Sequence, residues 1–185
     1  MLWLFSVSSV SSVVKAFPKK GAMKTKYRIL CIISVVVLVL DQATKLFIDR
    51  TMDLHTSIAV VQNFFSITYI RNKGAAFGFL ADSSYRLPFF ILISIIAVIV
   101  IIAVFRKLRP DQKLPAFSLA LIFAGAIGNL IDRVRLGEVI DFLDVHWYRH
   151  HWPAFNVADS AICVGVFLLA IDMLMEERRQ KSGKP

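Results

Sequence analysis

The pattern of apolar and polar positions divides the chain into four long apolar stretches separated by polar segments. A helix needs about 20 apolar residues to cross a bilayer core that is ~30 Å thick. The second stretch contains no charged residue, which argues against the alternative of a buried helical bundle in a soluble protein. The pattern therefore predicts four membrane-spanning helices, at 29–48, 87–105, 114–131 and 155–175.

The segment between the first two spans, 49–86, is too long to lack structure of its own. Residues 65–69 alternate between apolar and polar side chains, which predicts a strand. Residues 72–74 then predict a turn, and 75–79 a returning strand with small side chains. We expect a small sheet on the outer side of the membrane.

Charge gives the chain a direction in the membrane. With 57% hydrophobic residues a disordered chain is excluded, and the formal net charge of +9 is concentrated in three segments, 1–28, 106–113 and 176–185. Basic segments that alternate with spans are typical of cytoplasmic loops rather than of nucleic-acid binding. We therefore expect both termini in the cytoplasm, and the loops 49–86 and 132–154 outside.

Residues 1–22 form an N-terminal extension that fits neither a span nor a cleavable signal peptide. Met23 is followed by Lys24, Lys26 and Arg28, a pattern typical of the start of an inner-membrane protein. Residues 1–22 are interpreted either as the product of an upstream start or as a tail at the membrane surface. The membrane domain is then 23–185.

Polar side chains within the spans, or just beyond the end of the third one, gather in the outer third of the membrane, where a functional site is the default hypothesis. The group comprises Asp41, Lys45, Asn129, Asp132, Arg133, Asn156 and Asp159. Asp141 lies nearby within the apolar segment 139–143, which keeps its carboxyl at the interface. We therefore expect Asp141 and Asp159 to meet beneath the outer surface, where Asn129, Arg133 and Asn156 can orient them.

Structural roles compete with functional ones at several of these positions. Asp41 and Lys45 have the i,i+4 spacing of an ion pair. Asn129 and Asn156 can tie helices together by hydrogen bonds. Asp132 beside Arg133 can form a pair at a helix end, and Glu138 and Asp144 are expected to be solvated loop acids.

The sequence lacks the residues that other hydrolytic mechanisms require. Ser160 has no histidine in any span to activate it. His146 and His150 have the spacing of a zinc-protease helix, but the glutamate of that motif is missing, so we expect neither metal nor cofactor. Two carboxyls in a poorly solvated place share one proton, which is the arrangement of an aspartic protease.

Two non-enzymatic alternatives use the same polar residues. A proton-coupled transporter needs a polar route across both leaflets, whereas the inner part of these spans is almost free of polar groups. An assembly subunit would pair its polar groups with partner helices.

Five motifs in this order resemble bacterial lipoprotein signal peptidase, or signal peptidase II. They are Asp41-Gln42-Ala43-Thr44-Lys45, Asn72-Lys73-Gly74-Ala75-Ala76-Phe77, Gly128-Asn129-Leu130-Ile131-Asp132-Arg133, Val139-Ile140-Asp141-Phe142 and Ala154-Phe155-Asn156-Val157-Ala158-Asp159-Ser160. The resemblance covers about residues 25–175 and leaves out the first 22.

The resemblance implies an all-α membrane protein of four transmembrane helices with a small periplasmic β-sheet cradle. It implies an aspartic endopeptidase of the bacterial inner membrane that cuts diacylglyceryl prolipoproteins just before the lipidated cysteine. Asp141 and Asp159 match the catalytic pair. The family's polar active-site residues are matched by Asn72, Asn129, Arg133 and Asn156, and its supporting positions by Asp41, Lys45, Gly74 and Asp132. Globomycin-type cyclic peptides are implied as inhibitors, and we expect a monomer in contact with membrane lipid.

Overall fold

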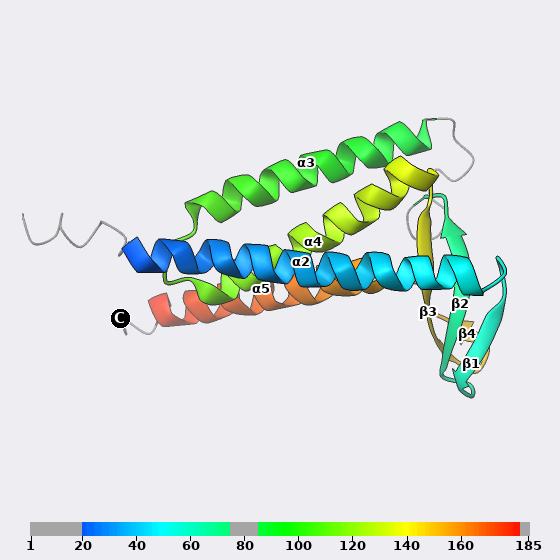
Figure 1. The fold of residues 1–185 in the computed structure, drawn as a ribbon. Coiled ribbons are helices and arrows are strands. Elements are labelled where there is room, and N and C mark those ends of the chain that lie inside the picture. The colour runs from blue at the N-terminus through cyan, green and yellow to red at the C-terminus, as the bar shows by residue number, and fades with distance from the viewer. Residues whose placement is uncertain (1–19, 75–84, 182–185) are drawn as a thin grey trace, which may run out of the picture.

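The structure, a computed structural model, describes residues 20–74 and 85–181. Four long helices lie side by side, and a small sheet covers one end of them (Figure 1). The helices are α2 (Lys20–Thr51), α3 (Arg86–Lys107), α4 (Lys113–Leu136) and α5 (Val157–Lys181). Each is long and apolar enough to cross a membrane, so the four predicted spans are confirmed.

The helices extend beyond the predicted spans because helical hydrogen bonding continues past the last apolar residue. Helix α4 in particular runs on to Leu136, so Asp132 and Arg133 lie inside it rather than beyond its end. Helix α5 starts at Val157, which makes Asn156 the residue just before the helix. Both shifts matter for the site, because they place these side chains at helix ends that meet.

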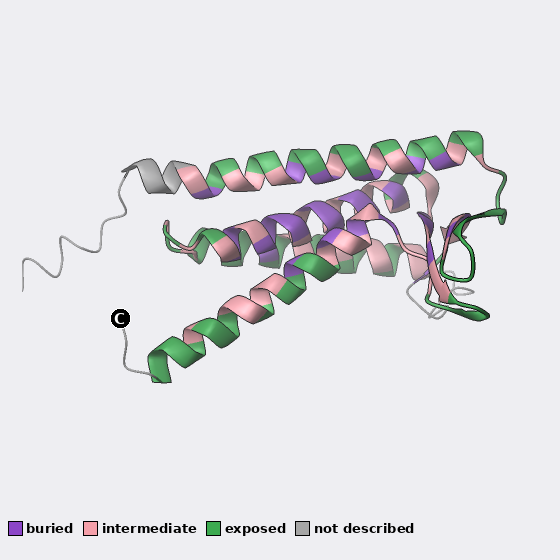
Figure 2. Ribbon diagram, turned by 90° about the horizontal axis from the view of Figure 1, so that it is seen from below, coloured by how far each residue is buried: buried purple, intermediate pink, exposed green. Residues whose placement is uncertain are grey.

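Helix α4 is the most buried of the four, and the other helices pack around it (Figure 2). Small residues allow this close approach. A Cβ at Gly125 would lie 2.3 Å from Ala158 O, and one at Gly165 would lie 2.7 Å from Ser118 O. Helix α3 is the least buried, and its exposed apolar side chains fit lipid.

The sheet has four strands in the order β1-β2-β3-β4. They are β1 (Ser57–Val61), β2 (Phe65–Asn72), β3 (Val139–Trp147) and β4 (His150–His151), and every pair is antiparallel. The strand predicted at 65–69 is confirmed as part of β2. The return strand predicted at 75–79 lies outside the described residues, as do residues 1–19 of the N-terminal extension.

The sheet packs on the C-terminal end of α2. Tyr69, Ile140 and Phe142 are buried against Ile48. Strand β3 therefore lies across the ends of the helices, where Ile70 pairs with Asp141 in the sheet register. This packing places Asp141 next to the first turn of α5.

Candidate active site

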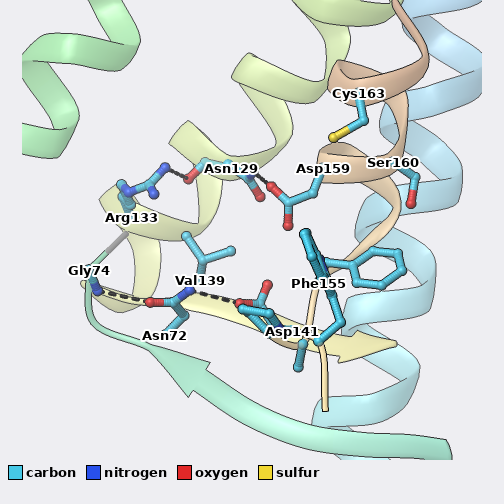
Figure 3. Close-up of a pocket in the computed structure, with 13 residues that line it drawn as sticks. Asn72, Gly74, Asn129, Arg133, Val139, Asp141, Phe155, Asp159, Ser160 and Cys163 are labelled. Carbon is cyan, nitrogen blue, oxygen red and sulfur yellow. Dashed lines mark hydrogen bonds between the residues drawn. The ribbon is translucent and has the colours of Figure 1, made fainter. Parts of the chain in front are cut away.

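A cavity of about 460 Å³ lies where α4 and α5 meet the sheet. Figure 3 shows Asp141 and Asp159 in this cavity, one from β3 and the other from α5. The structure thus brings the two predicted carboxyls together, with four of the predicted neighbours: Asn72, Gly74, Asn129 and Arg133. The remaining predicted residues, Asp41, Lys45, Asp132 and Asn156, are buried behind the cavity.

Asp141 is 2% exposed, and each of its carboxyl oxygens accepts one hydrogen bond. Asn156 Nδ2 donates to Oδ1 at 2.7 Å, and Asn72 Nδ2 donates to Oδ2 at 2.9 Å. Burial and the negative charge of Asp159 raise the pKa of Asp141 to about 7, against the opposing effects of these two amides and of Lys45. Asp141 therefore keeps a proton at pH values where an ordinary aspartate is fully ionised.

Asp159 lies in the first turn of α5 and takes part in a reciprocal cap. Its N–H donates to Asn156 Oδ1 at 2.9 Å, and its Oδ2 accepts the Asn156 N–H at 3.2 Å. This is the capping-box arrangement, which fixes the start of a helix through two side chains. Asn129 Nδ2 donates to the other oxygen, Oδ1, at 2.7 Å. The side chain of Asp159 is thus oriented from both α4 and the start of α5.

Asn156 connects the two carboxyls, because it bonds to Asp141 through its amide nitrogen and to the Asp159 N–H through its amide oxygen. It is 0% exposed, and its Nδ2 also lies 3.2 Å from Ile140 O and 3.2 Å from Asn129 Oδ1 on α4. The sequence expectation that Asn156 ties helices together and the expectation that it orients the carboxyls are therefore not exclusive, since one side chain makes both contacts.

Lys45 is the centre of a buried ionic cluster behind the cavity. Its Nζ lies 3.0 Å from Asp41 Oδ2 and 2.8 Å from Asp132 Oδ2, and it donates to Asn129 Oδ1 at 3.0 Å. Its three N–H bonds thus have three acceptors, as a buried ammonium requires. The predicted ion pair of Asp41 and Lys45 is confirmed, whereas Asp132 pairs with Lys45 and not with its neighbour Arg133.

The two acids of this cluster also fix the backbone beside each cavity carboxyl. Asp41 Oδ1 accepts the N–H of Ala158, the residue before Asp159, at 2.9 Å. Asp132 Oδ2 accepts the N–H of Ile140, the residue before Asp141, at 3.2 Å. One lysine with its two acids therefore sets the position of both carboxyl-bearing segments.

Arg133 contributes the positive charge of the cavity. Its Nη1 lies 3.4 Å from Asn129 O, and its guanidinium lies over the Phe90 ring at 5.4 Å from the centroid. Both Asp141 and Asp159 attract this charge. Because guanidinium carries five N–H donors, Arg133 can still donate to a ligand in the cavity.

Several expectations for the outer loop are wrong. Asp144 is buried, and His151 Nδ1 lies 2.9 Å from its carboxyl, so it is not a solvated acid. Glu138 is also largely covered and lies 3.9 Å from Arg86 Nη2. His146 and His150 lie on the paired strands β3 and β4, so their i,i+4 spacing does not place them on one helix face, in line with the rejection of a zinc-protease helix. Within the described ranges, no group of three or more His, Cys, Asp or Glu is arranged to bind a metal.

The cavity also contains side chains that the sequence reasoning did not assign to it. Trp152 and Pro153 line it from the segment before α5, and Cys163 lines it one turn further along the helix than Asp159. The i,i+4 spacing of Asp159 and Cys163 was a usable signal. Trp152 had no such signal, because its place depends on how the chain returns after β4.

Comparisons with known proteins agree with the resemblance in the sequence. The family described as Signal peptidase (SPase) II matches residues 33–175. The lipoprotein signal peptidase of Geobacter sulfurreducens is 70% identical over 85% of this chain and 99% of the relative, and that of Geobacter metallireducens is 66% identical over 85% and 98%. A solved structure described as a bacterial membrane enzyme, at 2.3 Å resolution, has a TM-score of 0.72 and 40% identity over 80% of this chain and 88% of its own. These similarities favour the peptidase over the transporter and the assembly subunit.

Proposed function

Because this chain belongs to the signal peptidase II family and cleaves signal peptides from prolipoproteins, we propose that Asp141 and Asp159 are its catalytic pair. The observation that carries the proposal is that both carboxyls line one cavity, where amide donors orient each of them. A raised pKa at Asp141 supports it, since a shared proton is what such a pair needs at neutral pH.

The chemistry follows from one ionised and one protonated carboxyl. The ionised carboxyl takes a proton from water as the water oxygen attacks the carbon of the scissile peptide bond. The protonated carboxyl donates to the peptide oxygen, so the intermediate is an uncharged diol. When the intermediate collapses, the carbon–nitrogen bond breaks and the nitrogen leaves with a proton from the carboxyl that received one from water. One hydroxyl of the diol returns its proton to the other carboxyl as the carbonyl forms again, which restores the starting pair.

Arg133 binds the peptide beside the reacting bond, and Asn72 orients one of the two carboxyls. Arg133 has donors to spare beside both carboxyls, which suits a substrate carbonyl. Asn72 uses its nitrogen on Asp141, and its oxygen accepts the Gly74 N–H at 3.0 Å, so its role is to orient Asp141. Gly74 supports this turn.

The substrate is a diacylglyceryl-modified prolipoprotein, which the enzyme cuts just before the lipidated cysteine. The position of the cavity supports this, because it lies at the ends of apolar helices whose outer surfaces are exposed. Acyl chains can remain in lipid while the peptide bond reaches the interface. Globomycin-type cyclic peptides inhibit by occupying the same cavity. The enzyme acts as a monomer without metal or cofactor, so strong chelators leave its activity unchanged.

In the membrane, the sheet faces the periplasm, and both termini are cytoplasmic. The basic segments support this orientation, since their described parts, 20–28, 106–113 and 176–181, lie at the end of the helices opposite the sheet (Figure 1). In a variant without native cysteines, a cysteine at His55 should react with an impermeant thiol reagent in intact cells, and one at Lys181 should not. The reverse labelling would contradict the orientation. Residues 1–22 are an extension, so a chain that starts at Met23 keeps full activity.

The test of the proposed function is an assay with the purified protein and a lipidated prolipoprotein in detergent micelles. Signal peptide should be released with no partner protein and no ion gradient. Asp141→Asn and Asp159→Asn should each remove the release while the protein remains folded. Normal release by either variant would contradict the assignment of the pair.

A further inference from the structure

Trp152 lines the cavity, and the catalytic chemistry leaves it without a role. It is 68% exposed, although it borders the same cavity as Asp141 and Asp159. An aromatic side chain contributes binding free energy when its large apolar area is covered. An indole that stays in contact with water makes no such contribution. A ligand that enters the cavity and covers this ring therefore gains binding free energy from it.

Trp147 shows that membrane contact alone does not account for Trp152. The two residues flank the same hairpin and are equally exposed, at 66% and 68%. Tryptophans at a membrane interface serve as anchors, and this role would suit both rings. Only Trp152 also belongs to the cavity lining. Trp147 is therefore a matched control for Trp152, because the two side chains are equally exposed and only Trp152 lines the cavity.

The backbone fixes Trp152 at the cavity before any substrate arrives. Its N–H donates to Val145 O at 2.9 Å, and the preceding residue, His151, pairs with His146 across the hairpin. Pro153 follows and restricts the chain further. Because the backbone is already ordered, little conformational entropy is lost when the ring is covered.

The depth order of the lining residues indicates which part of the substrate meets Trp152. Cys163 lies further along α5, away from the sheet, whereas Trp152 lies on the outer segment before the helix. Asp159, in the first turn of the helix, lies between them along the chain. An apolar signal peptide remains in the bilayer, and the mature chain leaves toward water. The signal peptide is therefore on the Cys163 side of the scissile bond, and the mature chain is on the Trp152 side.

We propose that Trp152 binds the first residues of the mature lipoprotein, those that follow the lipidated cysteine, and that it favours apolar side chains there. The proposal rests on the catalytic function above and adds a specificity that the carboxyl pair does not supply. A flat, exposed ring packs on aliphatic or aromatic side chains, whereas glycine has no side chain for it to contact.

The test uses two lipidated substrates, one with leucine and one with glycine at the two positions after the cysteine. The wild-type enzyme should cleave the leucine substrate with a kcat/KM about tenfold higher, chiefly through KM, because such a contact strengthens binding of substrate and transition state alike. Trp152→Ala should remove this preference and Trp152→Phe should keep most of it. Trp147→Ala should leave it unchanged.

Three outcomes would overturn the proposal: a wild-type enzyme without the preference, a preference that survives Trp152→Ala, or an equal loss in Trp147→Ala. The pair of substrates separates the two proposals, since an enzyme that cleaves neither contradicts the catalytic function, whereas equal cleavage of both contradicts only the role of Trp152. If Trp152→Ala does not fold, a photoreactive benzoylphenylalanine at position 152 of Asp141→Asn gives the answer. It should cross-link to the mature chain, and a cross-link to the signal peptide or the acyl chains would contradict the proposal.

Discussion

Two buried lysines of α2, Lys26 and Lys45, show how differently the two ends of the bundle use the same side chain. Lys45 at the outer end lies between two carboxylates and an amide. Lys26 at the opposite end donates to three backbone carbonyls at the end of α3, among them Leu108 O at 2.8 Å, and its Nζ lies 5.5 Å from the centroid of the Phe105 ring.

The partners determine what each lysine does. Lys26 satisfies the carbonyls that every helix leaves unpaired at its C-terminus, and it thereby joins α2 to α3. Lys45 joins α2 to acids that fix the backbone beside Asp141 and Asp159. The comparison teaches that burial and charge alone do not identify a functional lysine, because only the second one is connected to the cavity.

The largest effect is expected at the carboxyl pair itself. Asp141→Asn and Asp159→Asn keep the size of the side chain but remove the titratable group, so each should lower kcat by at least about 1,000-fold. Asp144→Asn is the matched control, because Asp144 is also a buried aspartate of β3 but does not line the cavity. Its turnover should stay within about threefold of wild type. Loss of activity in Asp144→Asn, with normal activity in Asp141→Asn, would show that Asp144 is the catalytic aspartate of β3.

Lys45→Met should have the next largest effect. It leaves two buried carboxylates without their cation, which costs about 3–5 kcal/mol of unfolding free energy. It also releases the segments that carry Asp141 and Asp159, and a displacement of about 1 Å can lower kcat roughly 100-fold. Denaturant unfolding and the kcat of the folded fraction measure the two effects separately. A folded variant with normal kcat would show that the cluster is only structural.

Asn72→Ala should change the pH dependence more than the fold. The wild-type rate should fall as the pH rises above about 7, because Asp141 loses the proton that the pair shares. Asn72 favours the ionised form of Asp141, so its removal should raise that pKa and move the alkaline limb to higher pH. A downward shift would contradict the contact. The kcat/KM profile from pH 4 to 10 gives this measurement.

Lys26→Met should have the smallest effect on activity and a moderate effect on stability. It removes hydrogen bonds from a charged donor, which contribute about 2 kcal/mol, while the cavity at the other end of α2 is untouched. The same substitution at position 45 is its control. If Lys26→Met lowered the kcat of folded protein as much as Lys45→Met does, the distinction between the two ends would be wrong.

Much of the fold was predictable, because long apolar stretches have few alternatives in a chain of this composition. The strand in β2 was predictable from its alternating side chains. Strand β3 was not, since its first residues, from Val139 to Leu143, are nearly all apolar and show no alternation. The spacing of the histidines likewise did not show that His146 lies in β3 and His150 in β4.

The residues of the site were predictable as a group, and their connections were not. Depth, spacing and apolar neighbours placed Asp141, Asp159 and Asn129 at one level, and the family resemblance selected the two aspartates as the catalytic pair. The reciprocal bonds of Asn156 and Asp159 depend on where α5 begins, and the pairing of Asp132 with Lys45 depends on how α2 packs on α4. Such contacts are set by tertiary packing, which a single sequence does not show.

The most direct test of the catalytic pair is the turnover of the double variant, Asp141→Asn with Asp159→Asn, beside the two single variants in one assay. Members of one catalytic unit are not additive, because the loss of either already removes the shared proton. The double variant should therefore have nearly the same residual kcat as either single variant. A double variant whose loss is the product of the two single losses would contradict the account, because it would show that the two carboxyls act independently.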